Sequence, residues 1–150
     1  MHAIIQKAKE SDVGELSNLF NFYRTFYNKN SDIETAKSFL SERIQEKESV
    51  IFIATIENKI VGFTQLYPLF SSLSMKRSWL LNDLYILEEY RGKGISKQLI
   101  ESAKQLAKET NAAGIMLETE KTNTVGNKLY PSSGFVLYDK NNFYWWQNPD

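Results

Sequence analysis

A short basic turn rich in glycine carries the clearest chemical signal in this chain. The turn reads Arg91-Gly92-Lys93-Gly94-Ile95-Ser96, and it lies between a strand-like apolar run and an amphipathic segment. Glycine permits positive φ and close approach of a ligand to the backbone. The start of a helix directs free N–H groups and the positive end of its dipole toward one place. We therefore expect this turn to bind a phosphate or pyrophosphate, with the Arg and Lys side chains adding local positive charge.

Composition argues against several other kinds of site. The chain has 150 residues, 42% of them apolar, which predicts one domain over residues 1–150 with a single core. Cysteine is absent and His2 is the single histidine, so we expect no disulfide, no thiol nucleophile and no metal site. The 18 basic and 18 acidic residues balance, so neither nucleic acid nor a membrane surface is an expected partner. The start of the chain lacks a signal-peptide core, and the sequence predicts a soluble, cytoplasmic protein.

Hydrophobic periodicity predicts an α/β (α+β) fold with about four helices and a mixed, largely antiparallel central sheet. The expected order is β-α-α-β-β-β-α-β-α-β-β. Helices are expected over residues 12–27, 31–44, 95–107 and 123–130. Strands are expected over residues 3–7, 50–56, 60–66, 79–87, 114–119, 135–138 and 143–146, with Pro68 ending the third. Helix and strand do not alternate strictly, which argues against a doubly wound sheet.

Two motifs in these elements resemble those of the GNAT superfamily of N-acetyltransferases. The acetyl-CoA signature of that family is Arg or Gln, two residues, Gly, one residue, then Gly or Ala, and residues 91–96 follow it as far as the last position. The second motif matches at Asn123, Gly126, Leu129, Tyr130, Gly134 and Phe135. Residues 23–27 and 81–85 are further similar to the branch named for histone and polyamine acetylation. The element order extends the resemblance over nearly the whole chain.

The chain departs from the family pattern at two positions. Ser96 stands where the family has Gly or Ala, so a Cβ and a hydroxyl lie where the backbone approaches phosphate. Pro131 directly follows Tyr130 and disfavours helical geometry at that tyrosine.

The resemblance implies acetyl-CoA as the acyl donor and no metal. The turn would cradle the pyrophosphate, and the pantetheine amides would pair with the open edge of the strand that contains Leu84, Tyr85 and Ile86. The N–H group of Ile86 would stabilise the developing oxyanion. Tyr130 would protonate the leaving thiolate, since a phenol is protonated at neutral pH. Asn123 would contact the cofactor, cap its own helix, or do both.

The general base is less sharply defined than the donor site. Asp83 and Asn82 lie on the strand before the turn, whereas Glu118 and Glu120 lie on or just after the next strand. Strand alternation places Asn82 and Asp83 on opposite faces, and a β-bulge would reverse which of them faces the cleft. We favour Asp83 as the base. A structural hydrogen bond of Asp83, with a water chain taking the proton, is the alternative.

Candidate acceptor contacts come from the junction of the first two helices and from the strands. Tyr23, Arg24 and Tyr27 would wall the acceptor pocket or belong to the core, and Asn82 and Glu118 would complete the site. The aromatic run over residues 143–146 alternates sides of a strand, so part of it would be core. The remainder would pack against a partner in a homodimer or cover the acceptor site.

The resemblance therefore implies direct acetyl transfer, in a ternary complex, to a primary amine. The expected acceptor is a small molecule such as a polyamine, an amino acid or a related metabolite, and a protein lysine or N-terminus is the alternative. A catalytically silent acyl-CoA-binding sensor or interaction module would keep the same turn. A mononucleotide-binding fold fits the turn alone, but not the helix pair and antiparallel strands before it.

Overall fold

The computed structural model describes residues 2–149, and the chain divides into two compact units with the boundary between Glu118 and Thr119. The first unit contains a sheet and three α-helices, and the second contains one α-helix and the C-terminal segment. The expected α/β class, with four α-helices and a mixed sheet, is confirmed. The single domain over residues 1–150 stays a prediction, and its first and last residues lie outside the described residues.

A five-stranded sheet organises the first unit. Its strands, in spatial order, are β1 (Ile4–Lys7), β2 (Val50–Ile56), β3 (Lys59–Ser71), β4 (Lys76–Ile86) and β5 (Ile115–Met116). Neighbouring strands are antiparallel from β1 to β4, whereas β5 runs parallel to β4. The strand expected over residues 114–119 is thus reduced to two residues.

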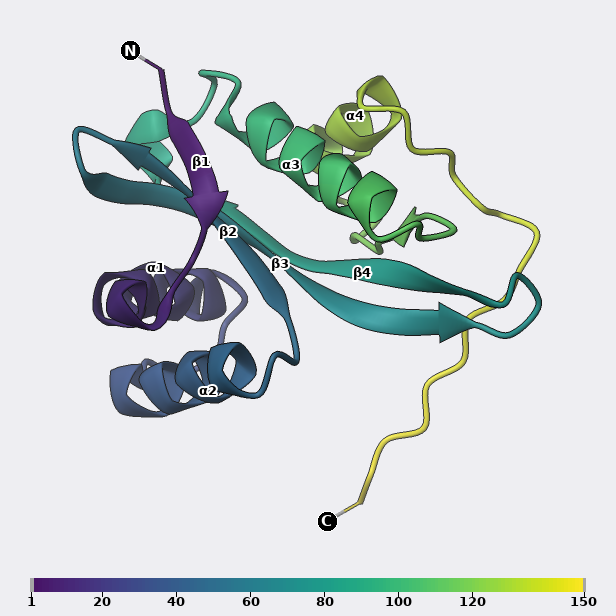
Figure 1. Cartoon of the computed structure of the whole chain (residues 1–150), viewed down its shortest axis with the longest axis horizontal. Coiled ribbons are helices and arrows are strands. Elements are labelled where there is room, and N and C mark those ends of the chain that lie inside the picture. The colour runs from purple at the N-terminus through teal and green to yellow at the C-terminus, as the bar shows by residue number, and fades with distance from the viewer. Residues whose placement is uncertain (1, 150) are drawn as a thin grey trace. The chain divides into compact units, whose positions relative to one another are not determined.

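Helices cover both faces of this sheet (Figure 1). The helices α1 (Val13–Phe26) and α2 (Ile33–Gln45) lie on one face, and α3 (Ile95–Glu109) lies on the other. Each helix turns an apolar stripe toward the strands, as the periodicity predicts. Fully buried side chains from all three layers form the core, among them Leu16, Leu40, Ile53, Phe63, Leu99 and Ile100.

The hairpin of β3 and β4 is longer than the sequence predicts. Pro68 does not end β3, because it lies opposite Trp79 and pairing continues to Ser71. The last residue of β3 that β2 pairs with is Leu66, so beyond that point β3 has β4 as its single neighbour. A proline is tolerated there because its missing N–H group removes no bond to a second strand.

The two strands expected at the C-terminus are wrong. Among the described residues, none after α4 (Thr124–Ser132) is in a strand. Phe135 is partly buried, whereas seven further large apolar side chains of this segment are 75–84% exposed; they are Val136, Leu137, Tyr138, Phe143, Tyr144, Trp145 and Trp146. A two-stranded ribbon is marginal in water unless one face packs against a core. With these side chains in solvent, nothing stabilises such a ribbon here.

Candidate active site

The glycine turn between β4 and α3 has the backbone geometry that its sequence predicts. The φ angles of Gly92 and Gly94 are 76° and 81°, in the region that favours glycine. The first helical bond of α3 runs from the N–H of Gln98 to the carbonyl of Gly94 over 3.2 Å, so the N–H groups of residues 94–97 precede the intrahelical ladder. A Cβ at either glycine would meet no atom within 4 Å. The turn thus fits a pyrophosphate, with open space beside its N–H donors.

The Arg91 side chain reaches back to the end of β4. Its Nε donates to the carbonyl of Ile86 at 2.8 Å. Its guanidinium carbon lies 5.3 Å from the ring centre of Tyr85 and 5.9 Å from that of Phe26. These contacts join the start of the turn to the end of the strand and to α1. Both charged residues of the turn, Arg91 and Lys93, are exposed.

One edge of β4 is open beyond its short pairing with β5. That pairing involves Trp79 and Leu80 on β4, so among the described residues no strand pairs with this edge over residues 81–86. The N–H of Leu87 donates across to the carbonyl of Val61 in β3 at 2.9 Å. Because donors alternate along an antiparallel strand, the N–H groups of residues 84 and 86 point to the open edge, and that of residue 85 points to β3. An extended ligand with amide groups can pair with such an edge.

A β-bulge in β4 determines which acidic side chain enters the core. Gln65 of β3 pairs with Asp83, and the next residue of β3, Leu66, pairs with Leu81. Asn82 is therefore the extra residue. Asn82 is exposed, whereas Asp83 is 4% exposed. The bulge considered from the sequence is present, and the buried member of the pair is the carboxylate.

The Asp83 carboxylate is held by a chain of hydrogen bonds. Its Oδ2 accepts from Nε2 of Gln65 at 2.7 Å, and its Oδ1 accepts from Nδ2 of Asn82 at 3.1 Å. The Oγ of Ser49 donates to Oε1 of Gln65 at 2.8 Å, which fixes the amide from its other end. Burial raises the pKa of Asp83, and hydrogen bonds from Gln65, Tyr23 and Asn82 offset part of that rise. The arrangement therefore gives a carboxyl that binds a proton more readily than an ordinary aspartate.

Two residues near Asp83 were not predicted from the sequence. Gln65 is fully buried on β3, where it and Thr64 are the two polar residues in the mainly apolar stretch 60–67. A side-chain amide in a buried strand needs polar partners, so the presence of Gln65 in that strand could have indicated a buried polar site. The pKa of Tyr67 is raised by burial and by the nearby charge of Asp83. Tyr67 thus adds a protonated phenol to the same side of the sheet.

The expected acceptor residues separate into two groups. The ring of Tyr23 lies 5.2 Å from that of Tyr27 and 6.0 Å from that of Tyr85, centre to centre. The hydroxyl of Tyr23 donates to the carbonyl of Asn82 at 3.4 Å, which brings these two predicted residues together. Arg24 instead donates from Nη1 to the carbonyl of Asn30 at 2.9 Å, in the connection between α1 and α2. Tyr23 is thus the α1 side chain that joins the bulge.

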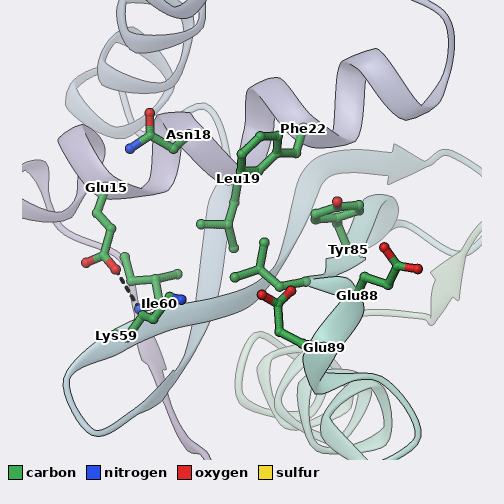
Figure 2. A pocket seen from close by; sticks show the side chains of 10 residues that line it. Glu15, Asn18, Leu19, Phe22, Lys59, Ile60, Tyr85, Glu88 and Glu89 are labelled. Carbon is green, nitrogen blue, oxygen red and sulfur yellow. Dashed lines mark hydrogen bonds between the residues drawn. The ribbon is translucent and has the colours of Figure 1, made fainter.

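A pocket of about 470 Å³ opens between α1, the start of β3 and the end of β4 (Figure 2). It is lined by Glu15, Asn18, Leu19, Phe22, Lys59, Ile60, Tyr85, Leu87, Glu88 and Glu89. Figure 2 shows Glu15 bonded to the backbone of Ile60 at one end and the other two glutamates at the opposite end. Three carboxylates against one lysine give the lining a negative balance.

Among the residues predicted for the site, Tyr85 alone lines this pocket. The pocket was missed because its wall combines segments far apart in the sequence. Tyr85 and Leu87 flank Ile86, so the pocket wall includes residues on both sides of the predicted oxyanion donor.

The remaining predicted residues lie after β5. Glu118, the last residue of the first unit, is exposed beyond the end of that strand. In the second unit, Oδ1 of Asn123 accepts the N–H of Gly126 at 3.0 Å, so Asn123 caps α4. Tyr130 lies within α4, and its ring centre is 6.0 Å from that of Phe135.

Pro131 is expected from the sequence to stop or kink the helix after Tyr130, and a stop there is wrong, because α4 continues to Ser132. A proline so close to the end of a helix removes one backbone bond, to the carbonyl four residues earlier. The N–H of Ser133 restores bonding in the last turn, donating to the carbonyls of Leu129 and Tyr130 at 3.0 Å each.

Comparisons with known proteins agree with this geometry. Residues 15–135 match the family described as acetyltransferase (GNAT) family. Over 131 residues the chain is 44% identical to "Uncharacterized N-acetyltransferase YhfO" of Bacillus subtilis, covering 87% of this chain and 88% of that protein. Over 135 residues it is 33% identical to "Probable acetyltransferase" of Haemophilus influenzae, covering 89% and 90%. A crystal structure of a probable acetyltransferase superposes with a TM-score of 0.93 at 40% identity, covering 98% and 99% of the two chains.

The chain therefore belongs to the acetyltransferase (GNAT) family, and the resemblance noted in its sequence is confirmed. It is an N-acetyltransferase, with acetyl-CoA as the acyl donor that the family uses. No helix within residues 2–149 has the length and apolar character needed to cross a membrane.

Proposed function

We propose that this protein acetylates the primary amine of a small cationic molecule, such as a polyamine, an amino acid or a related metabolite. The observation that carries the proposal is one continuous stretch, residues 81–96, in which an open strand edge leads into a glycine turn at the start of α3. Such a stretch offers backbone donors along an extended ligand and then around its phosphates.

The donor site is proposed to consist mainly of backbone. The N–H groups of residues 92–96 would hold the pyrophosphate, with Lys93 adding positive charge. The N–H groups of Leu84 and Ile86 face the open edge, where that of Leu84 would pair with a pantetheine amide and that of Ile86 would face the thioester carbonyl. When bound, acetyl-CoA supplies the activated acetyl thioester. Asn123 would be a further contact of the cofactor, because it belongs to the second motif.

Two groups on β4 are proposed to act on the reacting atoms. The N–H of Ile86 would donate to the oxyanion, and Arg91 fixes that end of the strand through its bond to the Ile86 carbonyl. Asp83 would accept the proton of the attacking amine, directly or through water. Its raised pKa favours that role because the affinity of a base for a proton rises with its pKa.

Tyr130 is proposed as the acid that protonates the leaving thiolate. The proposal rests on its position in the second motif, and the helical backbone at Tyr130 removes the objection that Pro131 raised. A phenol carries its proton throughout the neutral range, so the side chain is in the required form.

The acceptor is proposed to enter the pocket beside β4. Glu88 and Glu89 are exposed carboxylates of its lining, and they would attract the protonated end of a diamine or similar molecule. Phe22 and Tyr85 would contact its methylene groups. The pocket thus offers carboxylates to the cationic group of such a molecule and aromatic rings to its apolar part.

Release of free thiol from acetyl-CoA, measured with a panel of polyamines, amino acids and acetylatable peptides, tests this proposal. We expect one class of small cationic amines to accelerate thiol release saturably, with the acetylated amine identified by mass spectrometry. Peptides that exceed every small amine would contradict the proposed acceptor. Saturable binding of acetyl-CoA with no acceleration by any amine would instead favour the silent binding module.

A further inference from the structure

The carboxylate of Asp83 is poorly placed to take a proton directly from an amine. Asp83 is 4% exposed, and two amides bond to its oxygens, Gln65 to Oδ2 at 2.7 Å and Asn82 to Oδ1 at 3.1 Å. A side-chain amide donates hydrogen bonds but keeps its protons at neutral pH, so neither amide can pass a proton on. A base that is buried in this way needs a second group to bring the proton to it.

The side chain of Tyr23 connects this carboxylate to the pocket. Its hydroxyl hydrogen-bonds to Asp83 and lies 3.4 Å from the carbonyl oxygen of Asn82, so its one proton has two acceptors beside the β-bulge. Tyr23 is half-buried, whereas Asp83 is buried. The ring centre of Tyr23 is 6.0 Å from that of Tyr85, which lines the pocket shown in Figure 2. Tyr23 therefore lies next to the pocket wall at its ring and next to the buried base at its hydroxyl.

Aromatic packing holds the ring of Tyr23 in this position. Its centre lies 5.2 Å from that of Tyr27 and 5.8 Å from that of Phe63, both with the edge-to-face geometry that aromatic pairs favour. Phe63 is fully buried in the sheet, which makes it a fixed support for the ring. The substitution Tyr23→Phe keeps these ring contacts and removes the hydroxyl alone.

A phenol has the chemistry that the two amides lack. Its oxygen can accept a hydrogen bond from one group while its proton is donated to another. Among the described residues that hydrogen-bond to the carboxylate of Asp83, Tyr23 is the one with this property. Free phenolates are scarce at neutral pH, and a relay avoids forming one because the phenol gains a proton as it loses one.

We propose that Tyr23 is a catalytic residue that relays the proton of the attacking amine to Asp83, an inference that rests on the proposed role of Asp83 as the base. As the amine nitrogen bonds to the thioester carbon, one of its N–H bonds breaks and the proton passes to the phenolic oxygen of Tyr23. The O–H bond of Tyr23 breaks in the same step, and its proton passes to the carboxylate of Asp83. The sulfur leaves with the electron pair of the C–S bond, and Tyr23 ends the step as a neutral phenol.

The kcat of Tyr23→Phe on the plateau above the acid limb of the pH profile tests the relay. We expect the plateau kcat to fall by about 10²-fold, with KM for both substrates within about threefold of the wild type. The double variant Tyr23→Phe, Asp83→Asn should be little slower than Asp83→Asn alone, because residues that act as a unit have non-additive effects. Far-UV circular dichroism should show all of these proteins folded.

Two further variants separate a relay from a structural role. Gln65→Leu also removes a hydrogen bond from Asp83, so its acid limb should move to higher pH while its plateau kcat is regained. A tyrosine that only held Asp83 in place would behave like Gln65. Tyr67→Phe is the matched control, because it removes the other phenol that lies near the charge of Asp83, and it should keep its plateau kcat.

Three results would overturn the relay and leave the proposed acetylation of a small amine intact. They are a plateau kcat of Tyr23→Phe that equals that of the wild type, additive losses in the double variant, and a loss in Tyr67→Phe without one in Tyr23→Phe. If no amine accelerated thiol release by the wild type, the proposed acceptor and the relay would both be overturned.

Discussion

The donor side and the acceptor side of the proposed site are formed by different chemical groups. The donor side is backbone: N–H groups of one β4 edge and of a glycine turn, supplied by residues 81–96. The acceptor side is made of side chains, with carboxylates and aromatic rings contributed by α1, β3 and the end of β4. Backbone donors are nearly indifferent to side-chain identity, whereas a side-chain pocket is specific to it. We therefore expect two kinds of substitution: those that remove binding of the donor, and those that change which acceptor amine is bound.

The largest effect on donor binding is expected from Gly94→Glu. The φ of 81° at this position strains any other residue, and the new carboxylate would stand in the space proposed for the pyrophosphate. We expect calorimetry to show acetyl-CoA binding weakened by about 100-fold or more. Ser96→Ala, at the next but one position, is the matched control and should bind normally. Equal binding by both variants would place the donor elsewhere.

Asp83→Asn is expected to have a large effect on the chemical step. Removal of a general base lowers kcat by about 10²–10⁴ while donor binding persists. In the wild type the basic form of Asp83 is lost as the pH falls through its raised pKa. The acid limb of the rate profile should therefore lie above the pH at which an ordinary aspartate titrates. If the variant kept the full kcat, Asp83 would have a structural role, and water would accept the proton of the attacking amine.

The same residue makes a prediction about stability. A carboxyl whose pKa is raised in the folded state stabilises the fold fully below its unfolded pKa, and this contribution is lost as the pH rises through the folded pKa. Denaturant unfolding of the wild type and of Asp83→Asn, measured across that window, should show a fall in stability specific to the wild type. Parallel curves for the two proteins would show that the pKa is not raised.

The sequence could predict the strand, the glycine turn and the helix of the proposed donor side because these elements are contiguous. The glycines, the strand before them and the helix after them follow one another in the chain, so local rules suffice. The pocket depends on which residues of α1 face Tyr85, and this follows from packing. The same limit explains why the two strands predicted near the C-terminus were wrong. Residues 135–146 have strand propensity, but a strand also needs a neighbouring strand to pair with. The prediction that Pro68 ends the third strand was wrong for a related reason. A proline is tolerated at this position because β2 does not pair with β3 beyond Leu66.

Gln65→Leu should have an intermediate effect on the acceptor side. The change removes the 2.7 Å bond to Asp83 and leaves a buried carboxylate with fewer donors. We expect the pKa of Asp83 to rise further, which moves the acid limb of kcat to higher pH, and the free energy of unfolding to fall by about 1–3 kcal/mol. Ser49→Ala, which alters the far end of the same chain of bonds, should shift the profile in the same direction but less. A stability loss without a shift of the pH profile would mean that Gln65 only supports the core.

The smallest effect is expected from Glu88→Gln and Glu89→Gln. Each removes one exposed charge from the pocket lining, and exposed charge pairs are worth up to about 1 kcal/mol. We expect KM for a cationic amine to rise by up to about fivefold per substitution, with kcat and the KM for acetyl-CoA unchanged. The rise should shrink at high salt, because screening weakens exposed charges. Glu109→Gln, on α3 and outside the pocket, is the matched control.

The central claim is that backbone N–H groups of one continuous stretch hold the donor, and amide hydrogen exchange with and without saturating acetyl-CoA tests it most directly. We predict new protection at residues 84 and 86 and across residues 92–96, with little change at residue 85, whose N–H already faces β3. Protection that spares both the β4 edge and the glycine turn, in a sample that binds acetyl-CoA, would contradict the account.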